Sequence, residues 1–250
     1  MMKRFFLLAL AILCFASPAT AVEVADVLTA LQSPFAAGSG SARIKSFQAE
    51  FFQLSHLASL DRSQEGEGSV TVRFLDEKIP GANRVQFRWE YRKPTEQEIV
   101  SDGTTLWVYI PENNQVIRSA ISSNSERPDD PMTFLNSLGH LERDFFITWG
   151  EPQQDEKGNF LLNLKPRRES PMLQGMLVQV AAEAVAEVRN HKPVTTFPIV
   201  STTVLDPGGN STFIAFREVR MNPAISSSIF QFKVPEGVSV VKPGDVGLGL

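Results

Sequence analysis

The sequence has one cysteine, three histidines and no long apolar run after its first sixteen positions. A single cysteine excludes an internal disulfide framework and a cysteine-based zinc cluster. His56, His140 and His191 are too far apart in sequence to form a paired-histidine metal motif. A phosphate-binding loop, a dinucleotide fingerprint and a G-x-S-x-G nucleophile elbow are also missing. We therefore expect no metal, no cofactor and no enzymatic activity.

Positive charge is also in short supply, with 24 Lys and Arg against 28 Asp and Glu. This mildly acidic balance excludes a general nucleic-acid binder. The 250 residues are 42% apolar, which is enough to build a sizeable core. Eighteen Phe stand against only two Tyr, and Phe supplies apolar area without a polar group.

The first residues predict a secretory signal peptide rather than part of the fold. Lys3 and Arg4 precede an apolar stretch over 5–15, and Ala19-Thr20-Ala21 provides the small-residue pattern before cleavage. The apolar stretch is too short for a permanent membrane anchor. Cys14 follows Leu13 rather than a small residue, which argues against acylation there. We expect a signal peptide over 1–21 and an exported, soluble single domain over 22–250.

Alternating apolar and polar residues predict an antiparallel sheet with one solvated face. The alternation is clearest over 84–91, and Asp102-Gly103 is a strong two-residue hairpin signal between 97–101 and 104–110. The predicted strands are 47–51, 66–74, 84–91, 97–101, 104–110, 115–120, 144–149, 160–165, 211–217 and a last strand over 230–241 that Pro235 interrupts.

Two short segments have helical spacing of apolar residues, 24–31 and 131–138. They are the available cover for the apolar face of the sheet. The segment 172–188 is ambiguous between strand and helix, and the wider region 172–200 has no assigned role. A sheet covered by helices encloses either a filled core or a cavity, and composition does not separate these two alternatives.

Several motifs resemble the LolA family of periplasmic lipoprotein carriers. The strongest are F-R-W-E-Y at 87–91, then Pro94, then V-S-D-G-T-T-L-W-V-Y-I-P at 100–111. Upstream, F-Q-A-E-F-F-Q at 47–53 and G-E-G at 66–68 are similar to the family's first strand and its G-x-G step. Downstream, L-x-L-x-P at 162–166 and F-x-F-x-x-P-x-G-V at 230–238 resemble its last motifs.

The resemblance implies a mainly β fold, an incomplete antiparallel β-barrel with a helical lid over an apolar cavity. It implies a monomeric periplasmic chaperone that binds the acyl chains of lipoproteins released from the inner membrane. The implied partners are acylated lipoproteins, an inner-membrane ABC transporter of the LolCDE type and an outer-membrane receptor of the LolB type. The alternative is an envelope sensor or lipid-binding module of the same fold that recognises lipids or mislocalised lipoproteins.

The resemblance also indicates which residues to examine. Those expected to bind acyl chains are Phe51, Phe87, Trp89, Leu106 and Val108. Those expected in the lid, by their helical face, are Leu28, Leu31, Phe134 and Leu135. The family's lid-latching arginine has no counterpart in an R-P pair here, and Arg84 is the candidate replacement.

Overall fold

The computed structural model describes residues 21–36, 39–75, 85–121 and 133–243. The helices are α1 (Val24–Gln32), α2 (Thr133–Ser137), α3 (Leu141–Asp144) and α4 (Ala182–Arg189). The strands are β1 (Ser46–Leu57), β2 (Arg62–Phe74), β3 (Val85–Lys93), β4 (Gln97–Ser101), β5 (Thr105–Ile110), β6 (Gln115–Ala120), β7 (Phe145–Gln154), β8 (Phe160–Pro166), β9 (Gly175–Val180), β10 (Ile199–Leu205), β11 (Ser211–Met221) and β12 (Ser239–Val241).

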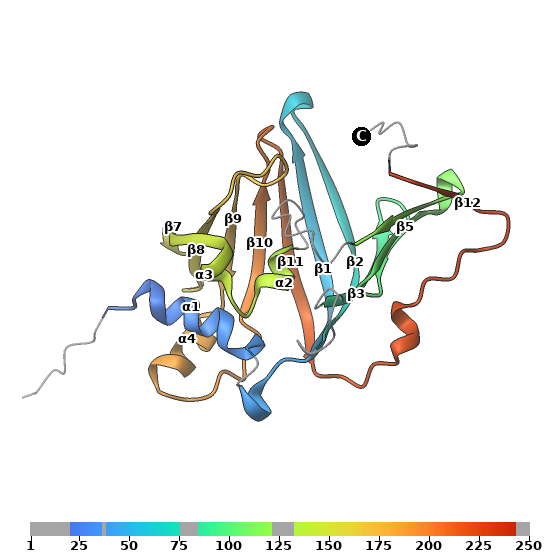
Figure 1. Ribbon diagram of the computed structural model, residues 1–250. Coiled ribbons are helices and arrows are strands. Elements are labelled where there is room, and N and C mark those ends of the chain that lie inside the picture. The colour runs from blue at the N-terminus through green and yellow to red at the C-terminus, as the bar shows by residue number, and fades with distance from the viewer. Residues whose placement is uncertain (1–20, 37–38, 76–84, 122–132, 244–250) are drawn as a thin grey trace, which may run out of the picture.

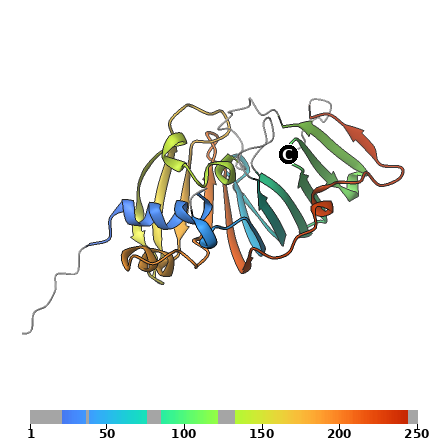
Figure 2. The ribbon, with the colours of Figure 1, turned by 60° about the horizontal axis from the view of Figure 1, so that its bottom comes forward.

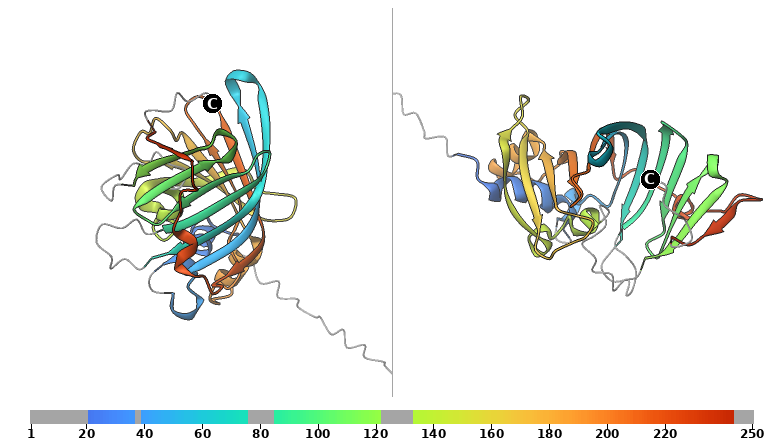
Figure 3. Two further views of the ribbon diagram at one scale, coloured as in Figure 1. Left: turned by 90° about the vertical axis from the view of Figure 1, so that its right-hand side faces the viewer. Right: turned by 90° about the horizontal axis from the view of Figure 1, so that it is seen from above.

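All twelve strands belong to one sheet, in the order β12-β6-β5-β4-β3-β2-β1-β11-β10-β9-β8-β7 (Figure 1). Every neighbouring pair is antiparallel except β12 and β6, which are parallel. The edge strands β7 and β12 lie at opposite ends of the curved sheet, so the sheet is not closed (Figures 2 and 3). This open sheet confirms the predicted fold class, a mainly β, incomplete barrel.

The helices lie on one face of the sheet, which we call the inner face, over its β7–β11 half (Figure 2). Alternation along β3 explains how the sequence produces this face. Val85, Phe87 and Trp89 are buried on the inner face, whereas Arg88 and Glu90 point to the outer face and form an ion pair at 3.0 Å. The strand predicted over 84–91 is thus confirmed, with bounds 85–93.

The predicted hairpin at Asp102-Gly103 is also confirmed, because β4 and β5 pair across it. Asp102 Oδ1 accepts hydrogen bonds from the backbone N–H groups of Thr104 and Thr105, at 2.8 and 2.7 Å. Gly103 has a φ of +94°, a conformation that side chains disfavour. The side chain of Asp102 and the missing side chain of Gly103 together produce the turn.

The first two strands are longer than the sequence predicts. Strand β1 continues past Phe51 to Leu57, and β2 begins at Arg62 rather than Gly66. The extra residues form the hairpin tip that projects beyond the rest of the sheet (Figure 1). Neither face of this tip is fully buried, so its residues lack the apolar alternation that predicts a strand.

The ambiguous segment 172–188 contains both alternatives in succession, first β9 and then α4. Strand β9 lies between β8 and β10, and α4 packs against α1. The region 172–200 is therefore part of the sheet and its helical cover, not an appendage.

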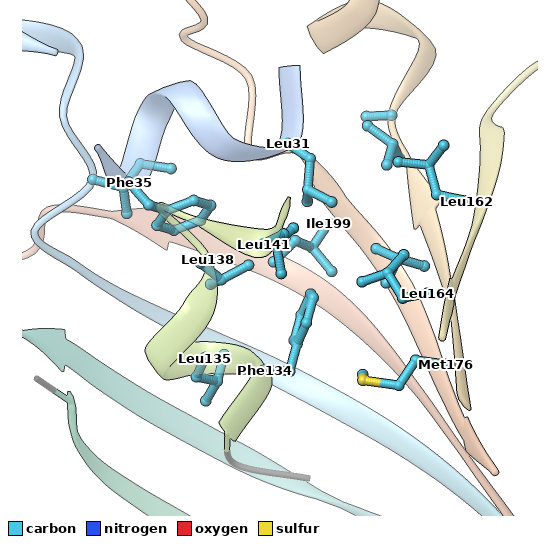
Figure 4. Packing of buried hydrophobic residues seen from close by; sticks show 14 of the residues in the cluster. Leu31, Phe35, Phe134, Leu135, Leu138, Leu141, Leu162, Leu164, Met176 and Ile199 are labelled. Atoms are coloured by element: carbon cyan, nitrogen blue, oxygen red, sulfur yellow. The ribbon is translucent and has the colours of Figure 1, made fainter. Parts of the chain in front are cut away.

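The main core lies between the helices and the β7–β10 strands (Figure 4) and continues across the inner face of β1–β3. One buried cluster contains Leu31 of α1, Leu138 after α2, Leu141 of α3, and Leu162 and Leu164 of β8. Full burial of such a side chain contributes about 1.5–3 kcal/mol. The two predicted helices are confirmed as cover, although Pro131, expected to begin the second, lies outside the described residues.

The predicted last strand over 230–241 is mostly wrong, since only β12 is a strand. Phe230 ends a short 3-10 helix, Ser227–Phe230, and its fully buried ring lies 4.8 Å from the Arg73 guanidinium. Phe232 stacks on Trp107 with ring centroids 6.4 Å apart. The alternate Phe residues therefore pack onto the outer face of β2–β5 instead of joining the sheet.

Candidate functional site

Three of the predicted acyl-chain residues are buried on the inner face, in the main core. Phe51 of β1 and Phe87 and Trp89 of β3 are 3%, 5% and 6% exposed. The rings of Phe51 and Trp89 meet edge to face, with centroids 4.8 Å apart and an interplanar angle of 67°. These three residues lie at the middle of the sheet, on β1 and β3, and we call them the aromatic wall.

Two glycines in β2 make room for this wall. Gly68 lies between Phe51 of β1 and Tyr91 of β3 in the strand register. A Cβ at Gly68 would lie 2.0 Å from the Glu90 carbonyl oxygen and 2.9 Å from a ring carbon of Phe51. A Cβ at Gly66 would lie 3.5 Å from the Tyr91 ring. At the G-x-G motif the aromatic rings of Phe51 and Tyr91 therefore pack directly on the backbone of Gly68 and Gly66.

The other two predicted residues, Leu106 and Val108, continue the inner face along β5. Cross-strand pairing places Trp89, Ile99, Val108 and Ile117 in one row from β3 to β6. Leu106 and Ile99 pack against the main core, whereas Val108, Ile110 and Ile117 lie beyond it and stay partly exposed. Among the described residues, the apolar face thus extends further than its covered core.

The predicted lid residues Leu28 and Leu31 of α1 and Phe134 and Leu135 of α2 are all buried in the main core. The helices are joined by a hydrogen bond that the sequence does not reveal, from the backbone N–H of Leu141 to Gln32 Oε1 at 2.6 Å. Arg84, the candidate latch, lies outside the described residues.

Two side-chain donors lie on the inner face of β3, one paired and partly buried and the other unpaired and buried. The Tyr91 hydroxyl donates to Gln53 Oε1 at 2.9 Å, and burial raises the pKa of Tyr91 to about 12. Trp89 Nε1 is buried and has no hydrogen-bond partner among the described residues. Leaving such a donor unpaired costs about 1–3 kcal/mol. The pairing of Tyr91 with Gln53 depends on strand register, so only Trp89 of these three residues could be predicted from the sequence.

Asp144, at the end of α3, joins helices α2 and α3 through a hydrogen bond from the Ser137 hydroxyl. Burial alone would raise the pKa of Asp144, but hydrogen bonds from Arg143 and from Ser137, at 2.7 Å, hold the pKa below its usual value. A carboxylate with a lowered folded-state pKa stabilises the fold above the unfolded-state pKa. That contribution is lost as the pH falls through the folded-state pKa.

Asp144→Asn should therefore destabilise the protein at neutral pH and become neutral in acid. Urea unfolding of both proteins between pH 7 and pH 3 measures the difference in unfolding free energy, which should shrink below about pH 4. Glu142→Gln, at an exposed position of the same helix, is the control for removing one negative charge. A difference that stays constant with pH would contradict the assigned role.

A pocket of about 340 Å³ opens elsewhere, between the end of α1 and the segment after α4. Thr29, Pro34, Val188 and Val194 are among its lining residues, and none of the predicted acyl-chain or lid residues lines it. No group of His, Cys, Asp or Glu within the described ranges is arranged to hold a metal ion. Among the residues that the structure describes, no helix has the length and apolar character needed to cross a membrane.

Comparison with known proteins places these features in a family. Residues 42–233 match the family model described as "Outer membrane lipoprotein carrier protein LolA". A protein named outer-membrane lipoprotein carrier protein from Methylobacillus flagellatus is 29% identical over 232 residues, covering 88% of this chain and 98% of that protein. One of the same name from Chromobacterium violaceum is 28% identical over 220 residues, covering 88% and 95%.

A solved structure, of a LolA superfamily protein from Nitrosomonas europaea, aligns with 85% of this chain and 99% of its own at 13% identity and a TM-score of 0.40. The family match spans more than half of the chain and includes the aromatic wall, the G-x-G step and the β4–β5 hairpin. The chain therefore belongs to the LolA family.

Proposed function

We propose that this protein is a lipoprotein carrier that holds acyl chains against the inner face of β3–β6. The observation that carries the proposal is the apolar row from Trp89 through Ile99 and Val108 to Ile117, whose far end continues past the covered core. Residues on the outer face of the same strands are instead covered by the chain's own segment around Phe230.

The energetics of acyl chains explain why a carrier needs such a surface. Each buried methylene contributes about 0.8 kcal/mol, so two or three chains amount to tens of kcal/mol. A lipoprotein would therefore leave a membrane very slowly without a protein surface that substitutes for lipid. The carrier must also release its cargo, and an equilibrium between closed and open positions of the helices α1–α3 would permit both steps.

In this proposal the cargo is an acylated lipoprotein, received from an inner-membrane ABC transporter of the LolCDE type and passed to an outer-membrane receptor of the LolB type. The protein acts in the periplasm as a monomer and has no catalytic role. Residues 1–21 direct export and are removed, and residues 22–250 act as one carrier domain. The curated relatives are named as carriers, which supports this function over the sensor alternative.

Pull-down of the mature protein from envelope extracts tests the proposal, with mass spectrometry of whatever is bound. We expect diacylated or triacylated lipoproteins, and depletion of the protein should leave these in the inner membrane. Recovery of delipidated proteins alone would contradict a carrier that grips acyl chains.

A further inference from the structure

The indole N–H of Trp89 is the unusual group of the inner face. The Trp89 side chain is 6% exposed, and its Nε1 atom has no acceptor among the described residues. Buried donors in folded proteins are almost always paired. An unpaired one at the centre of a binding wall therefore points to an acceptor that arrives with a ligand.

The neighbours of Trp89 explain why the part of the chain that the structure describes supplies no acceptor. Its ring lies 4.8 Å from that of Phe51 and 6.3 Å from that of Phe216. Its cross-strand partners are Val70 of β2 and Ile99 of β4. Each of these four side chains is a hydrocarbon, so none offers an oxygen or nitrogen atom that could accept a hydrogen bond from the indole N–H.

The contrast with Tyr91, two residues along the same strand, supports a ligand role. Gln53 lies on β1, where its Oε1 accepts a hydrogen bond from the Tyr91 hydroxyl. The inner face of β3 therefore holds one donor that a side chain of β1 pairs and one donor that no described residue pairs.

Trp89 also lies where the covered core meets the open part of the inner face. Its row continues through Ile99, which touches the core, to Val108 and Ile117, which do not. An acyl chain lying on Val108 and Ile117 would place its polar end, or its ester linkages, within this row.

We propose that the Trp89 indole N–H donates a hydrogen bond to an ester carbonyl oxygen of the cargo's diacylglyceryl group and so sets the depth of its acyl chains. The inference rests on the proposed carrier function. An ester carbonyl suits this position because it accepts a hydrogen bond and brings no donor of its own. The apolar neighbours of Trp89 could not satisfy a second polar group.

The test compares two synthetic lipopeptides that differ only in their linkages. One carries an S-dipalmitoylglyceryl cysteine, and the other carries the same group with both esters replaced by ethers. The wild-type protein should bind the ester about tenfold more tightly, the factor that one net hydrogen bond provides. Trp89→Phe, which keeps an aromatic ring without the N–H, should bind both lipopeptides equally.

Trp149→Phe is the matched control, since Trp149 is a partly buried tryptophan of the same face, on β7. It should keep the tenfold preference for the ester. The ratio of the two affinities is compared within each variant, so a general loss of stability cancels. The Trp89 indole proton resonance, identified by its absence from Trp89→Phe, should move downfield with the ester and not with the ether.

Equal binding of the two lipopeptides by the wild type, or an ester preference that survives in Trp89→Phe, would refute the proposed hydrogen bond. Neither result would contradict the carrier function. Failure of the wild type to bind either lipopeptide would instead refute the carrier function. The two failures are thus distinguishable. Dipalmitoylphosphatidylglycerol and its diether analogue form a second pair: an ester preference there as well would extend the site to diacylglycerol lipids in general.

Discussion

Val108→Glu should fold normally and lose at least tenfold in its affinity for acylated lipoproteins. Val108 lies on the inner face between Ile99 and Ile117 and is partly exposed, so the new carboxylate remains hydrated in the empty protein. An acyl chain laid over this row would bury that carboxylate. Burying an unpaired charge costs several kcal/mol, and each 1.4 kcal/mol is about a factor of ten in affinity.

Binding of a diacylated lipopeptide, followed by tryptophan fluorescence or by calorimetry, measures this loss. Leu205→Glu is the matched control, because Leu205 is an apolar strand residue, 39% exposed, that faces away from the inner face. It should bind the lipopeptide as the wild type does. Undiminished binding by Val108→Glu, with unchanged unfolding, would mean that the acyl chains lie elsewhere.

Gly68→Ala should destabilise the fold by about 3 kcal/mol, the upper part of the range for overpacking. The added Cβ would meet the Glu90 carbonyl oxygen at 2.0 Å, and that atom belongs to the backbone of the neighbouring strand. Relief requires β2 and β3 to separate or shift, which would also displace the Phe51 ring at 2.9 Å. A single methyl group thus disturbs both the sheet and the aromatic wall.

Urea unfolding measures the change in free energy as a shift of the midpoint. Gly175→Ala provides the control, since Gly175 lies in β9 and its Cβ would meet only the Leu164 carbonyl oxygen, at 3.4 Å. Alanine there should be neutral or stabilise by less than about 1 kcal/mol. If Gly68→Ala and Gly175→Ala unfold at the same urea concentration, Gly68 is not required by the packing of Phe51.

The strands of the β3–β6 region could be predicted from the sequence because local patterns mark them. The alternation at Val85, Phe87 and Trp89 and the Asp102-Gly103 turn are local signals, and both predictions are confirmed. Phe230 and Phe232 alternate in the same way, yet the first ends a 3-10 helix and both cover the outer face. Alternation indicates a half-buried segment. It does not distinguish a strand within the sheet from an irregular segment that packs across the sheet.

The candidate site was predictable only in part, because local spacing assigns a residue to a face of the sheet but does not reveal its tertiary partners. Apolar residues such as Phe51 and Trp89 can be assigned to one face from their spacing along a strand. Whether the Trp89 N–H has an acceptor depends on Phe51, Phe216 and Val70, which reach it from strands far away in sequence. Such tertiary contacts do not affect the local sequence pattern. The pairing of Tyr91 with Gln53 could not be predicted for the same reason.

The strand order has a consequence for the timing of folding. Strand β1 pairs with β11, and Asn222 Oδ1 accepts a hydrogen bond from the Lys45 backbone N–H, 177 positions earlier in the chain. A chain is made from its N-terminus, so β1 and β2 emerge long before β11 can pair with β1. Until then β1 is an edge strand that exposes Phe47 and Phe51, and such edges promote aggregation. The central wall is therefore completed only after nearly the whole chain has emerged, and we expect folding to be slow and dependent on protection of that early hairpin.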